Sequence, residues 1–374
     1  MLSFWEKNSF LNYDFIIIGS GILGLSTACC IKEKNKKAKV LVLEEGIFPT
    51  GASTKNAGFA CFGSLTEILA DIKNLGESAT FSLVEKRYKG IQKLRQRLGD
   101  KNIGYENYGG FELIMNKHMH CLDQLSSINK NLNHVFSEDV FSIRNEKIKE
   151  FGFNESQVKA VIFSKFESQI DTGKMMYSFI DYANSLGIRI LTGCEAASYS
   201  EKENYVKVFI KGNDAGNKIE LSAKKLFICT NAFTNKILPD INIKPGRGQV
   251  LITKPVENLK FKGVFHIDEG FYYFRNFENR VLFGGGRNLD FETEESTEFA
   301  VNEKILSDLK KKLSEIILPG QNFEIDLSWT GIMGFSKNRL PVVNNISDRV
   351  ACVMSCNGMG VALSSEIADE ITGK

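Results

Sequence analysis

Residues Tyr13 to Gly24 read YDFIIIGSGILG, and this stretch decides the fold. The apolar run from Phe15 to Ile18 does not alternate with polar residues, so it predicts a parallel strand that is buried on both faces. Gly19, Gly21 and Gly24 follow it at G-x-G-x-x-G spacing. Such glycines allow a tight turn, close approach of a pyrophosphate to the backbone, and close packing of the next helix on the strand.

A second apolar run, Val40 to Leu43, begins after the predicted helix and ends at Glu44. A carboxylate at this strand end can accept hydrogen bonds from both hydroxyls of an adenosine ribose, and it would repel a 2′-phosphate. The N-terminus of the intervening helix offers free N–H groups to phosphates. We therefore predict a dinucleotide site that includes the three glycines, Glu44 and the adjacent Glu45. A glycine-rich turn in another kind of α/β protein would not explain the strand, helix and acid together.

Size and composition limit the class of protein. The 374 residues suffice for two domains, and the net charge of +2 comes without a basic block interleaved with aromatic residues. Nucleic acid is therefore not an expected partner. The eight cysteines form no C-x-x-C pair and only four histidines are present, so we expect buried reduced thiols and no metal site.

The N-terminus and the hydropathy pattern favour a cytoplasmic protein. Glu6 and Lys7 interrupt the first apolar stretch, which therefore does not read as a signal peptide, and no apolar run is long enough to span a membrane. Phe4, Trp5 and Phe10 are expected to form a short helix or strap that packs on the body.

Further along the chain, buried apolar strands followed by helices alternate with strand-rich blocks, which indicates interleaved domains. Helices are expected near 66–74, 80–98, 173–186 and 298–317, with strands near 105–115, 160–163, 188–230, 250–284 and 350–355. One domain is predicted to comprise residues 1–75, 155–240 and 335–374. The other is predicted to comprise 76–154 and 241–334.

Several motifs together resemble the FAD-dependent D-amino-acid oxidase/glycine oxidase superfamily. They are the glycine fingerprint with Glu44, the G-A-S-x-x-N-x-G of Gly51 to Gly58, the R-G-Q of Arg247 to Gln249, the G-G-G of Gly284 to Gly286, and a C-terminal strand followed by N-G-M-G. The resemblance covers essentially the whole chain. It implies an α/β fold in which a Rossmann-like FAD-binding domain is interleaved with a mixed-sheet α+β substrate domain.

The resemblance also implies further contacts with FAD. In the Gly51–Gly58 loop, Ser53 and Asn56 would be polar contacts of the flavin, and Ala57 and Gly58 would bring backbone close to it. At the C-terminal end, N–H groups of Asn357, Gly358, Met359 and Gly360 would face the flavin N1–C2=O edge. A helix N-terminus there would stabilise the negative charge of the reduced ring. An ordinary tight turn is the alternative for the last two glycines.

The expected chemistry is hydride transfer from a C–N or C–O bond to flavin N5. Glycine oxidases hold a substrate carboxylate with an arginine soon after a W-x-G tryptophan, but Met333 or its neighbours take that place here. A second arginine, near the C-terminal glycines, is also missing. The segment W-x-G-x-M-G-x-x-x-N-R-L-P, residues 329–341, looks closer to the γ-glutamylputrescine oxidase branch, whose members attack a primary amine with no α-carboxylate.

Four side chains are candidates for contact with the substrate: Tyr273, Arg275, Arg287 and Arg339. The two arginines at 275 and 287 could bind an acidic substrate tail, or they could form surface ion pairs with Glu278 or Asp290. Arg339 could instead bind backbone carbonyls. Tyr272 and Tyr273 alternate along a strand, so one should face the cavity and the other the core.

We therefore predict an FAD-dependent enzyme that oxidises the CH–NH bond of a small amine or amino acid. The electron acceptor would be oxygen or a carrier. Leu282 stands where several amine oxidases have an oxygen-activating lysine, which favours a carrier. Because no cysteine lies between Trp329 and Pro341, the FAD should be bound non-covalently.

Other functions are left open. The same scaffold could oxidise a 2-hydroxy acid or glycerol phosphate, or bind flavin without turnover. A tRNA-modifying oxidase is also known in the superfamily, but the near-neutral charge disfavours a polyanionic substrate.

Overall fold

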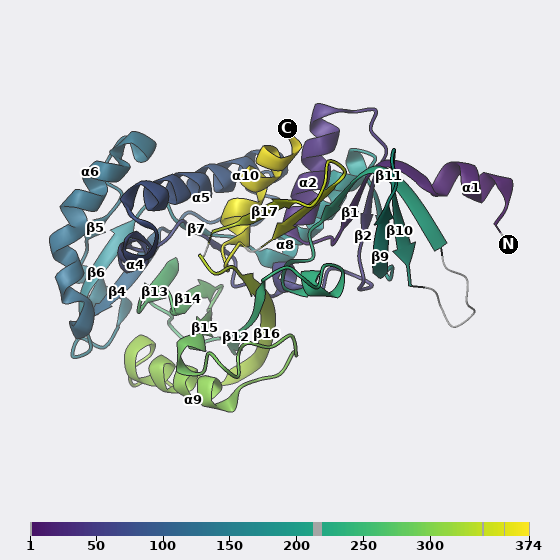
Figure 1. The fold of residues 1–374 in the computed structure, drawn as a ribbon. Helices are drawn as coiled ribbons and strands as arrows, with labels where there is room; N and C mark the ends of the chain where they lie inside the picture. Colours follow the sequence, from purple (N-terminus) through teal and green to yellow (C-terminus); the bar gives the residue numbers. More distant parts are fainter. Residues whose placement is uncertain (1, 212–218, 339, 355, 374) are drawn as a thin grey trace.

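The computed structural model describes residues 2–211, 219–338, 340–354 and 356–373, which form two large sheets with helices around them (Figure 1). The first sheet has the strand order β17-β18-β11-β1-β2-β8, with β10 and β9 attached to β11. Its strands are β1 Asn12–Ile18, β2 Val40–Leu43, β8 Arg189–Leu191, β9 Ala196–Glu201, β10 Val206–Ile210, β11 Ile219–Ile228, β17 Val342–Asn345 and β18 Val350–Met354.

Strand β1 lies at the centre of this sheet, parallel to both β11 and β2. Ile17 faces the helical side, where it packs with the buried residues of four helices. Ile16 and Ile18 face the opposite side, which the β9–β10 hairpin covers. The helices are α2 Ile22–Lys34, α5 Glu77–Leu98, α8 Thr172–Ser185 and α10 Gly360–Thr372. The apolar run of β1 is thus explained by burial on both faces, as the sequence predicts.

The second sheet has the order β16-β12-β15-β14-β13-β4-β6-β5, and all its pairs are antiparallel except β13 with β4. Its strands are β4 Gly110–Met115, β5 Ser142–Ile143, β6 Val158–Ser164, β12 Lys244–Thr253, β13 Val264–Ile267, β14 Tyr272–Phe277, β15 Arg280–Gly285 and β16 Ile325–Phe335. Helix α9 Glu303–Lys312 and the π-helical turn Leu313–Ile317 cover part of one face through an apolar core rich in phenylalanine.

Shorter elements connect and cover these sheets. Strands β3 Phe59–Ala60 and β7 Ser168–Gln169 form a small antiparallel pair between them. The remaining helices are α1 Phe4–Phe10, α3 Ala52–Lys55, α4 Leu65–Leu75, α6 Leu125–Phe136 and α7 Glu146–Phe151, and the 3-10 turns are Asn116–Gln124, Asn231–Lys236 and Arg287–Leu289. The predicted α/β class is confirmed: the first sheet has a parallel core, β18-β11-β1-β2-β8, with antiparallel strands attached, and the second is a mixed sheet.

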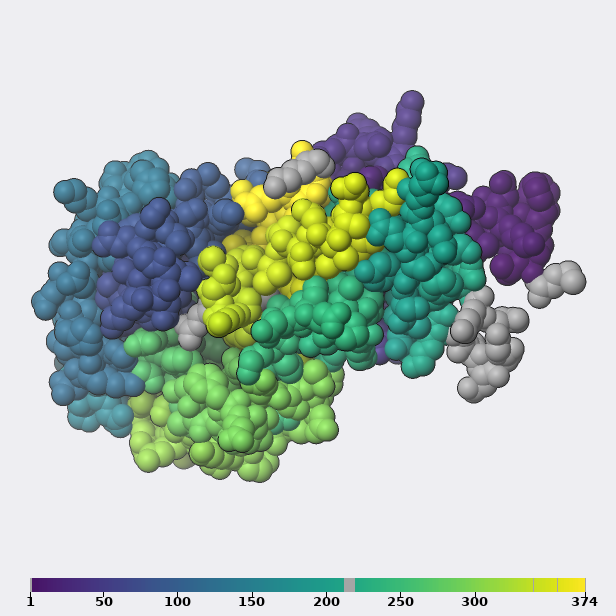
Figure 2. Space-filling view, viewed as in Figure 1, coloured from purple at the N-terminus to yellow at the C-terminus, as the bar shows by residue number. Residues whose placement is uncertain are grey.

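Two predictions about organisation need correction. Strand β6 pairs with β4 and β5 in the second sheet, so the boundary proposed at residue 155 assigns this strand to the wrong domain. The N-terminal helix α1 forms as predicted, with a capping box between Ser3 and Glu6, but it does not pack on the body. Phe4 and Trp5 are 70% and 72% exposed, and Figure 2 shows the helix standing out from the molecule.

Among the described residues, each helix is too short or too polar to cross a lipid bilayer.

Candidate functional site

One cavity of about 1070 Å³ lies where three separated parts of the chain meet. The first glycine loop and the end of β2 form one part of its wall, the 51–57 loop forms another, and residues 356–360 a third. Strands β12 to β16, helices α4 and α5 and several loops also contribute to the wall. The predicted cofactor residues that line it are Gly19, Gly21, Glu44, Glu45, Ser53, Asn56, Ala57, Gly358, Met359 and Gly360.

The first glycine loop leaves no room for side chains. A Cβ added at Gly24 would lie 1.9 Å from the carbonyl oxygen of Gly19, so α2 can pack on β1 only with glycine there. Gly19 has φ +101°, and its Cβ would lie 2.8 Å from the carbonyl oxygen of Cys229. Gly21 is the residue before α2 and lines the cavity. The loop therefore presents bare backbone to a ligand.

Ser53 lies at the N-terminus of α2. Its Oγ accepts a hydrogen bond from the backbone N–H of Ile22 at 2.9 Å. The hydroxyl thus reaches across from another segment to the start of the helix, where pyrophosphate is expected. The sequence predicted a polar contact of Ser53 with the flavin, whereas the structure places its hydroxyl at the start of α2.

Glu44 is almost completely buried and lines the cavity. Its Oε2 accepts hydrogen bonds from the backbone N–H and the hydroxyl of Ser20, at 3.0 and 2.6 Å, and its Oε1 accepts from the N–H of Gly46 at 3.1 Å. These bonds fix a carboxylate at the end of β2 and leave about one acceptor site, on Oε1, for a ribose hydroxyl. Glu45 lies at the rim, where it forms an exposed ion pair with Lys236.

Asn56, which the sequence predicts to contact the flavin, shapes the 51–58 loop through its hydrogen bonds. Its Oδ1 accepts from the N–H of Gly58 at 2.8 Å and from the Thr172 hydroxyl at 3.0 Å, and its Nδ2 donates to the carbonyl of Ser53 at 2.8 Å. Gly58 has φ +72° and a Cβ there would lie 2.3 Å from the Ile170 carbonyl oxygen, but Gly58 does not line the cavity. Gly58 shapes the loop instead of meeting the ligand.

Arg275 takes neither of the roles predicted for it. The side chain is buried and does not line the cavity. Its Nε donates to the carbonyl oxygen of Ala57 at 2.5 Å, so it braces the loop from behind. Burial lowers the pKa of Arg275 to about 10, with Asp171 and Glu106 opposing the shift.

The floor of the cavity is one row of residues across the second sheet. Val250 pairs with Gly284, Gly284 with Tyr273, and Tyr273 with His266, so all four point to the same face. A Cβ at Gly284 would lie 2.6 Å from the ring of Tyr273. The Tyr273 ring thus occupies the space that a side chain at Gly284 would fill, and this flat ring forms that part of the floor.

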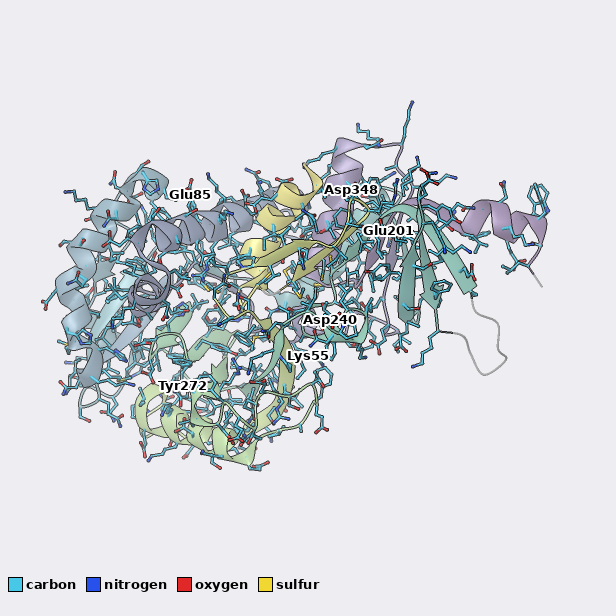
Figure 3. All side chains as sticks on the ribbon, viewed as in Figure 1. Lys55, Glu85, Glu201, Asp240, Tyr272 and Asp348 are labelled. Carbon is cyan, nitrogen blue, oxygen red and sulfur yellow. The ribbon has the colours of Figure 1, made fainter. Side chains whose placement is uncertain are left out.

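The two adjacent tyrosines face opposite sides of this sheet. Tyr273 lines the cavity, and burial raises its pKa to about 12, so the phenol stays protonated at neutral pH. Tyr272 is buried on the other face, towards α9, where its hydroxyl donates to Asp308 at 2.8 Å (Figure 3). Of the two, Tyr273 is the one that can contact a substrate.

The C-terminal wall is a second helix N-terminus. Asn357 and Gly358 have φ +48° and +87°, and α10 begins at Gly360. The Oδ1 of Asn357 accepts from the backbone N–H of Ser336 at 3.0 Å, which joins this turn to the end of β16. Met333 also lies here, with its sulfur 3.5 Å from a Cβ added at Gly358. Two helix N-termini, a Glu44 carboxylate and a flat floor fit a dinucleotide that carries a planar ring.

Of the two predicted substrate-binding arginines that the structure describes, Arg275 and Arg287, it is Arg287 that lines the cavity. Its guanidinium carbon lies 4.1 Å from the ring centre of Phe335 and 5.2 Å from that of Phe291. This stacking holds a cation at the wall, so Arg287 stays a candidate for an acidic substrate group. Arg339 falls outside the described residues.

A group of polar side chains that no sequence pattern indicated lies at the end of the floor, next to Tyr273. His266 lies 3.0 Å through Nε2 from Glu167 and 3.4 Å through Nδ1 from Glu67. These carboxylates raise the pKa of His266 to about 9 although burial opposes the shift. Arg87 and Asp71 form a buried ion pair at 3.4 Å and also line the cavity.

This group includes a set of metal-ligand atoms that the sequence did not predict. The ligand atoms of Cys61, Glu167 and His266 lie within 4.8 Å of one another. Glu167 also accepts from the backbone N–H groups of Phe62 and Gly63. Burial raises the pKa of the Cys61 thiol well above its usual range, which opposes the thiolate that a metal needs. Hydrogen bonding accounts for this arrangement without a metal.

Four cysteines line the cavity: Cys61, Cys194, Cys229 and Cys356. Burial raises the pKa of each thiol, to about 11 for Cys356. A thiol of this kind is a poor nucleophile, because the thiolate is the reactive form. This agrees with the prediction of non-covalent FAD.

A family model described as FAD dependent oxidoreductase (DAO) matches residues 14–373. The probable oxidoreductase OrdL of Haemophilus influenzae is 23% identical over 381 aligned positions, which cover 94% of this chain and 80% of OrdL. Among solved structures, L-proline dehydrogenase from P. horikoshii gives a TM-score of 0.76 at 15% identity, covering 97% of this chain and 92% of that one. Glycine oxidase from Geobacillus kaustophilus gives 0.75 at 17%, covering 97% and 95%. These structures share the fold.

Proposed function

Because the chain belongs to the DAO family of FAD-dependent oxidoreductases, we propose that it oxidises the CH–NH bond of a small amine or amino acid. The observation that carries the proposal is the single cavity in which both helix N-termini, Glu44 and the floor beside Tyr273 meet. When bound, FAD supplies the hydride acceptor at flavin N5. Similar structures include L-proline dehydrogenase, glycine oxidase and L-amino acid deaminase, and their substrates favour amine over alcohol chemistry.

The protein would contribute mainly by positioning. Glu44 would accept a hydrogen bond from a ribose hydroxyl, and the N-terminus of α2 with Ser53 would bind the pyrophosphate. The N–H groups at the start of α10 would face the electron-rich edge of the flavin. Tyr273, a protonated phenol at neutral pH, would donate a hydrogen bond to the substrate beside the ring.

Substrate recognition would differ from that of a simple amino-acid oxidase. Met333 follows the W-x-G motif at the cavity wall where glycine oxidases have a carboxylate-binding arginine. Arg287 would then be the cation that binds any acidic tail, further from the reacting amine. This pattern supports the γ-glutamylputrescine oxidase-like branch within our proposal.

Anaerobic bleaching of the flavin tests the proposal. The purified protein should be yellow and should release FAD on denaturation. Small amines or amino acids should bleach the bound flavin, whereas 2-hydroxy acids and glycerol 3-phosphate should not. Bleaching by hydroxy acids alone would refute amine oxidation, and a fully loaded flavin that no reductant bleaches would indicate a binding protein without turnover.

A further inference from the structure

The cavity is polar at one end, which we define by Glu67, Asp71, Arg87 and His266. His266 ends the floor row that runs from Val250 through Tyr273, so this polar end adjoins the proposed ring position. Helix α4 supplies Glu67 and Asp71, and α5 supplies Arg87. The polar end therefore lies within reach of a substrate placed against the floor.

Negative charge exceeds positive charge here. Besides Glu67 and Asp71, two further carboxylates lie behind the wall: Glu167 bonds to His266, and Glu112 accepts from Ser64 and Thr66. The salt bridges of the described residues give these four carboxylates only Arg87 and His266 as cationic partners. Burial raises the pKa of Glu112, which favours its neutral form. Even with Glu112 neutral, the other three carboxylates exceed the two cations, Arg87 and His266, by one negative charge. A cation from the cavity would offset this charge.

Glu67 is the carboxylate best placed to meet that cation. Its side chain is 23% exposed, against 11% for Asp71 and 2% for Glu167. Its Oε2 is fixed by the N–H of Ser64 at 3.0 Å and by His266. The side chain is therefore held in place and open to the cavity.

The aromatic lining of this part of the cavity also agrees with a cationic ligand. The rings of Phe59 and Tyr273, which both line the cavity, meet edge to face with centroids 5.6 Å apart. The face of an aromatic ring attracts a cation.

We propose that Glu67 determines substrate specificity by binding a second cationic group of the substrate, so that the preferred substrates are diamines or related cationic amines. This inference rests on the proposed amine oxidation and narrows it. The reacting amine would lie over the floor beside Tyr273, and the remote ammonium would lie at the polar end against Glu67 and Asp71. Zwitterionic α-amino acids would bring an unfavourable carboxylate towards these groups.

The test compares two primary amines of equal chain length, 1,4-diaminobutane and n-butylamine, in anaerobic flavin bleaching, with glycine and L-proline alongside. The diamine should half-saturate bleaching at a concentration about tenfold or more below that for n-butylamine. The Glu67→Gln variant should lose most of this preference, because the concentration of diamine that half-saturates bleaching should rise towards that of n-butylamine. Asp71→Asn should give a smaller change in the same direction.

The variants are chosen to keep the fold. Glu67 closes a capping box with Ser64 at the start of α4, and glutamine can make the same bond, so Glu67→Gln removes charge without removing the cap. The matched control is Glu324→Gln, an exposed carboxylate paired with Lys254 on the surface, which should leave the diamine preference intact. FAD content should be equal in all variants.

The outcomes separate this inference from the proposed function. Equal half-saturation by both amines overturns the inference while amine oxidation stands, and so does bleaching by amino acids without the diamine. A diamine preference that Glu67→Gln leaves unchanged also overturns it. If only hydroxy acids bleach the flavin, the proposed function fails, and the inference fails with it.

Discussion

Replacing Glu44 by glutamine should weaken binding of FAD but not of FMN, which lacks the adenosine. The carboxylate is fixed at the end of β2 by three protein hydrogen bonds, two from Ser20 and one from Gly46. Glutamine retains one acceptor oxygen but loses the charge and the second acceptor. The variant should therefore lose about one charge-assisted hydrogen bond to the ribose.

A hydrogen bond to a charged group contributes about 1.5–3 kcal/mol. At about 1.4 kcal/mol per factor of ten, the dissociation constant for FAD should rise about 10- to 150-fold. Fluorescence titration of the apoprotein with FAD, and in parallel with FMN, measures the effect. The FMN constant should stay within a factor of about two because the ring and ribityl phosphate do not reach Glu44.

Glu45→Gln is the matched control, since it removes a charge one residue away. Glu45 is more than half exposed and pairs with an equally exposed Lys236, so this change should leave FAD affinity nearly unaltered. Unchanged FAD affinity in Glu44→Gln would refute the ribose assignment. An equal loss of FAD and FMN would show that the variant disturbs the loop and not the ribose contact.

The other predictions concern packing and pH. Gly24→Ala should abolish FAD retention, measured as flavin per protein, because its Cβ would lie 1.9 Å from the carbonyl oxygen of Gly19; wild-type flavin content would contradict the packing argument. The pKa of His266 is raised from 6.5 to about 9 in the fold, so its stabilisation is complete below pH 6.5 and is lost as the pH rises through 9. The urea midpoint should fall across that interval, and less steeply in His266→Gln. Tyr272→Phe should lose about 1 kcal/mol of unfolding free energy with no change in the flavin spectrum, since it removes only the bond to Asp308; a spectral change would place Tyr272 nearer the flavin than we find.

Local sequence rules predicted the turns and helix starts that form the proposed nucleotide half of the site. The glycine loop, the end of β2 at Glu44 and the start of α10 each depend on residues close in sequence. Their turns and helix ends follow from short-range sterics and hydrogen bonding. That is why Gly19, Gly24 and Gly358 could be assigned before any three-dimensional information.

The same rules failed where a side chain has a choice of partners. Arg275 looked like a substrate ligand or a surface ion pair, yet it bonds to the Ala57 carbonyl in the interior. Asn56 looked like a flavin contact, and most of its hydrogen bonds go to its own loop and to Thr172. Strand β6 was assigned to the wrong domain, because its pairing with β4 depends on long-range contacts that local sequence does not encode.

The polar end of the cavity was beyond such rules altogether. Glu67, Glu167 and His266 lie about a hundred residues apart in sequence, and each looks ordinary alone: a helix-capping acid, a loop acid and a polar residue in an apolar strand. Sheet pairing brings His266 next to Tyr273, and the first turn of α4 places Glu67 next to His266. Since the charges that set specificity come from long-range packing, the sequence could predict the cofactor far better than the substrate.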